Sequence, residues 1–381
     1  MRIAVIGAGM FGAAAAKYLA RDGADVTLIG PGEPARPADH TGLFASHYDA
    51  GRITRGLDPW PFWSRVSRAS IARYRVIEAD SGIPFFTEAG SLMSGPEGSA
   101  QMDRLQSVAR RDKISCDVLR NGELAARFPY FTFPEGTLGL HEPADAGHID
   151  PRAMVRAQIT LALRHGARHL AEEVISLDDR AGSVALTLAG SGTLHFDRVL
   201  LATGGFSRLL TGEQLPFKVF ARTAALFEVT AQEAARLSEM PTLIHLLPNG
   251  EDPYLLPPIR YPDGRICLKM GGDRVDRELR DRAELVDWFR SGGDPEVAAM
   301  LEDQLTARMP GLAIAGRDRL ACVTTYTPDN IPHLTDLSER VHSVIGGGGR
   351  GAKCSDEVGR LGAMQVRGET LPDWAREAAV A

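Results

Sequence analysis

The sequence predicts an α/β fold in which a parallel-sheet domain of Rossmann type is interrupted by a second, α+β domain built on an antiparallel sheet. Three observations predict this fold. Near the N-terminus the glycine turn GAGMFG joins a short apolar segment to a helical one. Two later apolar segments, RVLLATGG at 198–205 and VHSVIGGGG at 341–349, also run into glycine turns. Between them, residues 220–230 and 253–270 alternate apolar and polar side chains, as antiparallel strands do.

Length and composition restrict the class of protein. The 381 residues are 44% hydrophobic and 24% charged, which suits a globular protein with room for two domains. A net charge of -6 gives no reason to expect nucleic acid or an anionic membrane as a partner. The four cysteines lie far apart without metal-ligand spacing, so we expect no metal site and a reducing compartment. Without a signal peptide or a long apolar segment, the expected location is the cytoplasm.

The first elements form a βαβ unit. RIAVI at 2–6 and DVTLI at 25–29 are short apolar segments typical of buried parallel strands. Between them, residues 10–21 carry apolar side chains at helical spacing and end before Gly23. A Pro- and Gly-rich segment at 30–42 is then expected to be a loop. A right-handed crossover between parallel strands follows from this order.

The later elements follow from the same patterns. We expect helices at 60–81, at 151–165, within 275–308 and from about 355, and strands within 85–95 (paired with each other), 173–187, 193–203, 319–326 and 341–345, with a hairpin at 253–270 around PDG at 262–264. Ser355 is expected to cap the last helix, with Asp356 and Glu357 in its first turn. The predicted domains are residues 1–88, 145–215 and 320–381 for the parallel sheet, and 89–144 and 216–319 for the antiparallel one.

Gly7-Ala8-Gly9-Met10-Phe11-Gly12 is the first motif that carries chemistry. It follows a strand and opens a helix, which is the context of a dinucleotide-binding turn: the first glycine allows the tight turn, the second admits a pyrophosphate and the third lets helix and strand pack closely. The acidic ribose ligand expected after the second strand is replaced by Gly30, so Glu33 or Asp39 would have to serve. Arg36 nearby slightly favours NADP, and the motif alone leaves FAD and NAD(P) open.

The stretch GGGGRGAKCS at 346–355 nearly matches a P-loop. Lys353 is displaced by one residue and no Ser or Thr stands beside it, which argues against Mg²⁺-nucleotide binding. Several stretches taken in order explain it better: SHYDAGRITR at 46–55, EPADAGHIDP at 142–151, LATGG at 201–205, CLKMGG at 267–272, CVTTYTPD at 322–329, TPDNIP at 327–332 and GGGGRGAK at 346–353. With the N-terminal motif, they resemble the D-amino-acid oxidase-like flavoprotein superfamily, and within it the monomeric sarcosine oxidase and N-methyltryptophan oxidase branch.

The resemblance implies an FAD-binding, glutathione-reductase-like domain beside a substrate domain, and it assigns the substrate side to Arg55, Lys353, Lys269 and Tyr254. Arg55 and Lys353 are expected to hold a substrate carboxylate, because a guanidinium forks onto one with two hydrogen bonds. Lys269 is expected to activate O2, since a fixed cation stabilises charge that develops on oxygen. Tyr254 matches a pocket tyrosine. Residue type alone leaves a structural alternative for three of these residues. Arg55 would then be part of a solvated basic loop, Lys269 would lie on an exposed strand, and Tyr254 would belong to the core.

On the flavin side, the resemblance places Arg52 near the ring and Cys322 at the position of a cysteine joined to it through sulfur. An inert buried cysteine is the alternative, with Cys354 as the nearest competitor. Glycines of the late run are expected to let the backbone lie against the ring. The expected cofactor residues are Gly7, Gly9, Met10, Phe11, Gly12, Arg52, Ala202, Thr203, Gly204, Cys322, Gly347, Gly348, Gly349, Gly351 and Lys353.

The implied function is an FAD-dependent oxidase, expected as a monomer, that oxidises the C–N bond of a carboxylate-bearing amine to an imine and reduces O2 to hydrogen peroxide. Asp273 and Arg350 depart from the branch, which has histidines at these places, and this puts sarcosine itself in doubt. The two residues are candidates to pair with each other. A flavin dehydrogenase that uses a carrier or quinone, an NAD(P)-dependent dehydrogenase and a non-catalytic nucleotide-binding protein are the alternatives.

Overall fold

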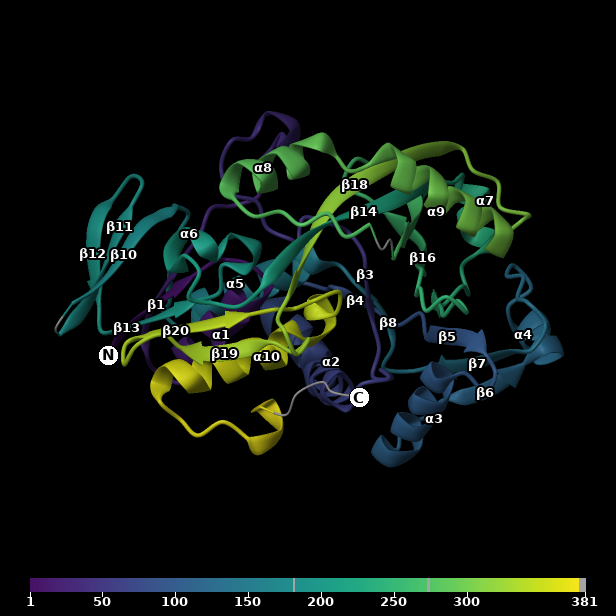
Figure 1. Cartoon of the computed structure of the whole chain (residues 1–381), viewed down its shortest axis with the longest axis horizontal. Helices are drawn as coiled ribbons and strands as arrows, with labels where there is room; N and C mark the ends of the chain where they lie inside the picture. Colours follow the sequence, from purple (N-terminus) through teal and green to yellow (C-terminus); the bar gives the residue numbers. More distant parts are fainter. Residues whose placement is uncertain (181, 273–274, 377–381) are drawn as a thin grey trace.

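The computed structural model describes residues 1–180, 182–272 and 275–376 (Figure 1). Its strands form two large sheets and two small ones. The six-stranded sheet contains, in spatial order, β19 (His333–Asp336), β20 (Val341–Ile345), β13 (Arg198–Leu201), β1 (Arg2–Ile6), β2 (Asp25–Ile29) and β9 (Arg168–Leu170). All neighbouring pairs in it are parallel except β19 with β20. This is the Rossmann-type sheet expected from the βαβ unit.

The two faces of this sheet are covered differently. Alternate residues of a strand point to opposite faces, and in β1 Ile3 and Val5 pack with one set of helices while Ala4 and Ile6 pack on the other side. The helices on the first face include α1 (Met10–Arg21), α5 (Pro151–Arg164) and α10 (Gly351–Arg367), with α2 (Pro61–Ser81) beside them. The opposite face is covered by the small antiparallel sheet of β10 (Val174–Arg180), β11 (Ser183–Leu188) and β12 (Gly192–Phe196).

The eight-stranded sheet forms the rest of the molecule. In order it contains β18 (Gly316–Tyr326), β14 (Lys218–Glu228), β17 (Ile266–Gly271), β16 (Tyr254–Arg260), β15 (Thr242–His245), β5 (Ser91–Pro96), β7 (Thr137–Glu142) and β6 (Asp117–Arg120). Only β15 and β5 pair in parallel. Around it lie α3 (Ala100–Asp112), α4 (Asn121–Arg127), α7 (Ala231–Arg236), α8 (Arg282–Ser291) and α9 (Pro295–Arg308). Figure 1 shows β14 and β18 as one long ribbon that rises from the parallel sheet.

The second small sheet lies next to the site described below. It consists of β3 (Arg52–Thr54), β8 (Gly147–Ile149) and β4 (Phe86–Thr87). The remaining short helices are η1 (Pro37–Asp39), η2 (Gly204–Phe206), α6 (Arg208–Thr211) and η3 (Asp373–Arg376). Within the described part of the chain, none of the helices combines the length and the apolar character that crossing a membrane requires.

Three expectations about elements are wrong in detail. β4 and β5 do not pair with each other, because the chain leaves the small sheet after β4 and enters the large one at β5. The segment within 275–308 contains two helices, since Gly292 and Gly293 adopt φ of +71° and +103° between them. The strands expected at 173–187 and 193–203 are each divided in two, and Gly182, at φ +96°, lies between β10 and β11.

Candidate active site

A cavity of about 870 Å³ is lined by residues of both large sheets. The turn after β1, the turn after β13 and the glycine run before α10 contribute backbone to it, while β14, β17 and β18 contribute side chains. Every catalytic and cofactor residue expected from the sequence lines this cavity except Gly12. The fold thus brings together residues from the beginning, the middle and the end of the chain.

The N-terminal turn fits a pyrophosphate group. A Cβ on Gly7, whose φ is +110°, would lie 2.3 Å from the carbonyl oxygen of Ala202, and one on Gly12 would lie 1.9 Å from that of Gly7. These two glycines are therefore required by backbone packing. A Cβ on Gly9 would meet nothing within 4 Å. Because Gly9 opens onto the cavity at the N-terminus of α1, an anion has room there to accept hydrogen bonds from backbone N–H groups.

Gly30 explains why the usual acidic ribose ligand is missing. A Cβ at this position would lie 2.6 Å from the backbone nitrogen of Ala8, so no side chain fits between the two βα turns. Glu33 lines the cavity instead and forms an ion pair with Arg152 at 2.7 Å. The other two candidates, Arg36 and Asp39, pair with each other at 3.4 Å on the surface. Of these three side chains, Glu33 is the one that lines the cavity.

The glycine run before α10 forms the opposite wall. Gly346 and Gly348 adopt φ of +96° and +50°, and a Cβ on Gly347 would lie 2.9 Å from the Cα of Gly351. The run therefore needs glycine for its backbone course. It leaves bare backbone along the cavity, where a flat ring can approach closely.

Ser355 does not cap the last helix, contrary to expectation. α10 begins at Gly351, four residues earlier, and the Ser355 hydroxyl donates to the carbonyl oxygen of Ala352 at 2.9 Å inside the helix. Asp356 and Glu357 consequently lie beyond the first turn and bind neighbouring helices. Lys353 lies in the first turn of α10, and its side chain forms part of the cavity wall.

Lys269 on β17 is held by Asp49, a residue to which sequence reasoning assigned no role. Its ammonium donates to Asp49 Oδ2 and, at 3.0 Å, to the carbonyl oxygen of Gly51. Arg52 contacts the same carboxylate through Nε at 2.9 Å. Burial alone would raise the pKa of Asp49, but the charges of Lys269 and Arg52 outweigh it and lower the pKa to about 2. Lys269 is 1% exposed, so this ion pair is a buried feature of the cavity wall.

Cys322 and Tyr254 lie on the same side as Lys269. The Cys322 thiol faces the cavity and receives a contact from Arg52 Nη2 at 3.3 Å. Cys354, the competing cysteine, is fully buried within α10, and burial raises the pKa of its thiol to about 12. The Tyr254 ring lines the cavity with the Lys269 ammonium 5.7 Å from its centroid. Of these two cysteines, Cys322 is the one that lines the cavity.

Arg55 and Lys353 meet at Asp58, which is completely buried. One oxygen, Oδ2, contacts Lys353 Nζ at 2.8 Å, Arg350 Nε at 3.1 Å and Arg55 Nη2 at 3.4 Å. The other oxygen accepts the backbone N–H of Trp60 at 3.2 Å. We call Asp58 with its three cations the Asp58 cluster. It joins the loop after β3 to the glycine run some 290 residues later.

Charge and burial oppose each other in this cluster. Burial would raise the pKa of Asp58, but Arg350, Lys353 and Arg55 hold it far below its usual range. Burial lowers the pKa of Lys353 to about 8, with Arg55 acting in the same direction and Asp58 against it. Behind the cluster, Glu142 accepts the backbone N–H groups of Gly56 and Leu57 at 3.0 Å each. Burial raises the pKa of Glu142 to about 7.

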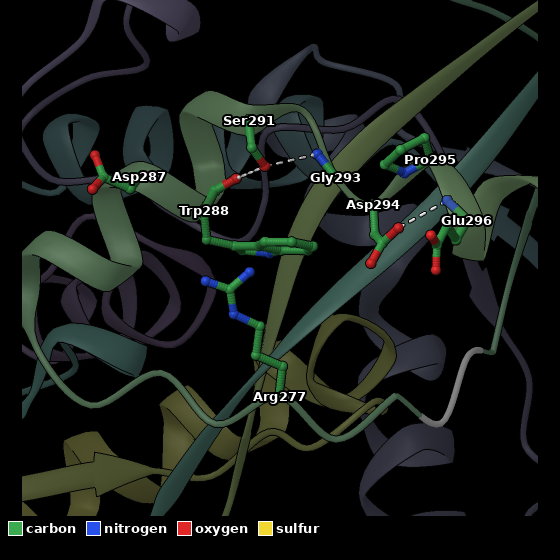
Figure 2. A pocket seen from close by; sticks show the side chains of 8 residues that line it. All are labelled: Arg277, Asp287, Trp288, Ser291, Gly293, Asp294, Pro295 and Glu296. Atoms are coloured by element: carbon green, nitrogen blue, oxygen red, sulfur yellow. Dashed lines mark hydrogen bonds between the residues drawn. The ribbon is translucent and has the colours of Figure 1, made fainter.

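A second, smaller cavity of about 440 Å³ opens beside the C-terminal end of α8 (Figure 2). In Figure 2 the Arg277 guanidinium lies against the Trp288 ring, at 5.6 Å from its centroid. The Trp288 indole N–H donates to the backbone carbonyl of Cys322 at 2.8 Å. This cavity contains none of the expected site residues, and its connection to the site is the support that Trp288 gives to β18.

Comparison with known proteins agrees with this geometry. A family model described as FAD dependent oxidoreductase (DAO) matches residues 2–364. Monomeric sarcosine oxidase from Bacillus sp. (strain B-0618) is 26% identical and aligns with 97% of this chain and 93% of its own length. N-methyl-L-tryptophan oxidase from Yersinia pestis (strain Pestoides F) is 25% identical, with coverage of 97% and 95%. The open form of NikD, an unusual amino acid oxidase essential for nikkomycin biosynthesis, superposes with a TM-score of 0.78 at 22% identity, covering 100% of this chain and 98% of NikD.

The chain belongs to the DAO family of FAD-dependent oxidoreductases. The predicted family, the fold class and FAD as the cofactor are thereby confirmed, and the chain is a flavin enzyme. Among the alternatives, NAD(P) as the cofactor is wrong. The roles given to individual residues stay predictions, although all of these residues except Gly12 line the same cavity.

Two residues of the site were missed from the sequence, Asp49 and Asp58. Each stands three positions from an arginine of the matched stretch, Asp49 before Arg52 and Asp58 after Arg55. That spacing was a usable signal, because buried arginines need carboxylate partners. The suggested partner of Arg350, Asp273, lies outside the described residues, and in the described part of the chain Arg350 pairs with Asp58.

Proposed function

We propose that this protein is an FAD-dependent oxidase of a carboxylate-bearing secondary amine or amino acid. The observation that carries the proposal is the convergence of Arg55 and Lys353 on one buried point of the cavity wall, with Lys269 in the same cavity. The two curated relatives are named for oxidation of sarcosine and N-methyl-L-tryptophan. Both are N-methyl amino acids with one carboxylate, which is the group that a lysine and an arginine together bind well.

Arg55 and Lys353, both held by Asp58, would orient the substrate. Lys353 donates one of its N–H bonds to Asp58, and Arg55 uses Nη2 for Asp58 and Nε for Met93 Sδ at 3.2 Å. Their remaining donors would bind the substrate carboxylate and fix the carbon next to the nitrogen relative to the glycine run. FAD, when bound, supplies the acceptor for the hydride equivalent that leaves this C–N unit. The imine product would then be hydrolysed by water.

Lys269 would serve the oxygen half-reaction. Reduction of O2 to hydrogen peroxide passes through negatively charged oxygen, which a fixed cation stabilises. Asp49 and the Gly51 carbonyl hold the Lys269 ammonium in place. We propose Tyr254 as a wall of the substrate pocket, Arg52 as a neighbour of the flavin ring and Cys322 as its covalent attachment.

The backbone would hold the cofactor. Gly7, Gly9, Met10 and Phe11 would bind the pyrophosphate, and Gly12 would keep α1 close to the turn. Ala202, Thr203 and Gly204 would line the dinucleotide, with Glu33 as the ribose ligand in place of Gly30. Gly347, Gly348, Gly349 and Gly351 would lie against the ring, with Lys353 at its substrate side.

Anaerobic reduction of the purified yellow protein across a panel of amines tests the proposal. We expect bleaching near 450 nm by carboxylate-bearing secondary amines, and peroxide formation in stoichiometric amount when air is admitted. Full bleaching without peroxide would instead indicate a dehydrogenase that passes electrons to a carrier or quinone. A flavin that no amine reduces would overturn the proposal.

Acid precipitation tests the covalent link separately. The precipitated wild-type protein should be yellow and that of Cys322→Ala colourless. A yellow precipitate from Cys322→Ala would exclude this cysteine, and Cys354→Ala is the matched control. The domain limits, the monomeric state and the cytoplasmic location stay predictions from the sequence.

A further inference from the structure

Arg350 had no role in the sequence-based interpretation, yet it forms part of the cavity wall. Its Nε donates to Asp58 Oδ2 at 3.1 Å, and its guanidinium lies 5.9 Å from the centroid of the Trp63 ring. The side chain is 25% exposed, whereas those of Asp58 and Lys353 are 0% and 2% exposed. Arg350 is therefore anchored to the wall through Nε, and it is more exposed than Asp58 and Lys353.

The other edge of this guanidinium has no partner among the residues that the structure describes. In the described ranges 1–180, 182–272 and 275–376, neither Nη1 nor Nη2 of Arg350 forms a hydrogen bond. Arg55 presents a similar vacancy among these residues, since only its Nε and Nη2 have partners. A guanidinium edge with two parallel N–H donors matches the two oxygens of a carboxylate. The wall thus offers donors at Arg350 in addition to those predicted to bind the first carboxylate.

Charge in the wall favours a further anion. Three cations surround one oxygen of Asp58, so their charged ends lie within a few ångströms of one another. Asp252 also lines the cavity and acts electrostatically on Arg350 and Arg55, but it has another interaction of its own. Glu142 is the third nearby carboxylate, and both of its oxygens accept hydrogen bonds from backbone N–H groups. Burial raises the pKa of Glu142 to about 7. After one substrate carboxylate is bound to Arg55 and Lys353, the outer edge of Arg350 still has no acceptor within the described part of the chain.

We propose that Arg350 binds a second carboxylate, so that the preferred substrates are dicarboxylic secondary amines whose N-substituent or side chain carries the additional acid group. The inference rests on the proposed amine oxidation and deepens it. Asp58 acts here as a positioning residue that keeps Arg350 next to Arg55 and Lys353. A monocarboxylic amine would leave the outer guanidinium edge to water and would lose one forked, charge-assisted contact.

Unreactive carboxylates separate binding from turnover. Succinate and butyrate each contain four carbons and differ in the second carboxylate. Their dissociation constants for the holoenzyme would be measured from the perturbation of flavin absorbance and from quenching of tryptophan fluorescence, to which Trp63 beside Arg350 contributes. We expect succinate to bind at least about tenfold more tightly than butyrate.

Arg350→Gln should reduce the succinate preference to less than about threefold and leave butyrate binding within about threefold of wild type. Arg350→Lys keeps a charge for Asp58 without the fork and should give an intermediate preference. Arg180→Gln, at an exposed position on β10, is the matched control and should change neither constant. Flavin content and thermal unfolding identify any variant that fails to fold. If Arg350→Gln fails to fold, the succinate preference of Arg350→Lys is compared with that of the wild type instead.

Equal affinity of the wild type for succinate and butyrate would overturn the inference. The inference would also be overturned if Arg350→Gln weakened the binding of succinate and of butyrate by the same factor. Arg350 would then only maintain the geometry of the Asp58 cluster. These outcomes are distinct from a failure of the proposed function. If succinate is preferred but no amine reduces the flavin, the amine oxidation is wrong. If monocarboxylic amines are oxidised as efficiently as dicarboxylic ones, the second subsite is wrong.

Discussion

Two buried aspartates near the α10 N-terminus attract cations in different ways. Asp356 on α10 accepts from Lys17 at 2.6 Å and Gln158 at 3.0 Å through one oxygen, and from Arg73 at 2.6 Å and Tyr18 at 2.8 Å through the other. We call this set the Asp356 cluster. Asp58 concentrates three cations on a single oxygen at 2.8–3.4 Å. Both carboxylates are 0% exposed.

The two clusters differ in whether the side chains around the aspartate also face the cavity. The Asp356 cluster joins α1, α2, α5 and α10, and both oxygens of its carboxylate are each held by two donors from neighbouring helices. In the Asp58 cluster, Arg55, Arg350 and Lys353 all line the cavity. The first arrangement holds neighbouring helices together, and the second presents cations to the cavity. A buried ion cluster is therefore a candidate binding site only when its partners also face open space.

The largest expected effect is on folding, from Asp356→Asn. A neutral amide would remove the buried carboxylate of Lys17 and leave Arg73 with Glu357, which costs about 3–5 kcal/mol of unfolding free energy. Urea unfolding measures the loss. Asp25→Asn breaks an exposed ion pair with Arg168 and is the control, with an expected change below about 1 kcal/mol. Equal losses of unfolding free energy in the two variants would mean that the buried Asp356 cluster stabilises the protein no more than an exposed ion pair does.

Lys353→Met should affect binding next most strongly. Loss of one charge-assisted contact should weaken acetate binding to the holoenzyme about tenfold to a hundredfold. Wild-type binding should weaken as pH rises through the Lys353 pKa of about 8, because an anion favours the protonated lysine. The variant should show no such dependence. Lys218→Met, at an exposed position on β14, should retain it.

Asp58→Asn should shift that pH dependence. The charge of Asp58 raises the pKa of Lys353 against burial and against Arg55. Without this charge, the pH at which acetate binding weakens should fall by about one unit or more, which corresponds to about 1.4 kcal/mol. Acetate titrations between pH 6 and pH 10 measure the midpoint. An unchanged midpoint would mean that Asp58 does not control the lysine.

Tyr18→Phe is expected to have the smallest effect. It removes one of four donors to Asp356 while leaving both cations, so the unfolding free energy should fall by about 1 kcal/mol. Acetate binding should remain at its wild-type value, since Tyr18 is not among the residues of the cavity. A change in acetate affinity larger than about threefold would show that the two clusters are coupled through α10.

Some features of the site followed from the sequence because they depend on local chain geometry. Gly7 and Gly12 were recognisable since a strand–turn–helix leaves no room for Cβ atoms at these positions. The late glycine run was recognisable for the same reason. The matched stretches around Arg55, Lys269 and Lys353 predicted residues that all line one cavity. By contrast, the beginning of α10 was placed four residues late, because Ser355 resembles a cap when its neighbours are unknown.

The βαβ unit, the glycine turns, the family and a set of residues that line the cavity followed from the sequence alone, because short-range patterns and ordered motifs carry that information. Which charges meet became visible only in the folded chain. Asp58 and Lys353 are 295 positions apart, and Asp49 and Lys269 are 220 apart. The physical reason is that a buried charge needs a partner wherever the fold supplies one, and that partner is chosen by the packing of strands and helices rather than by neighbours along the chain.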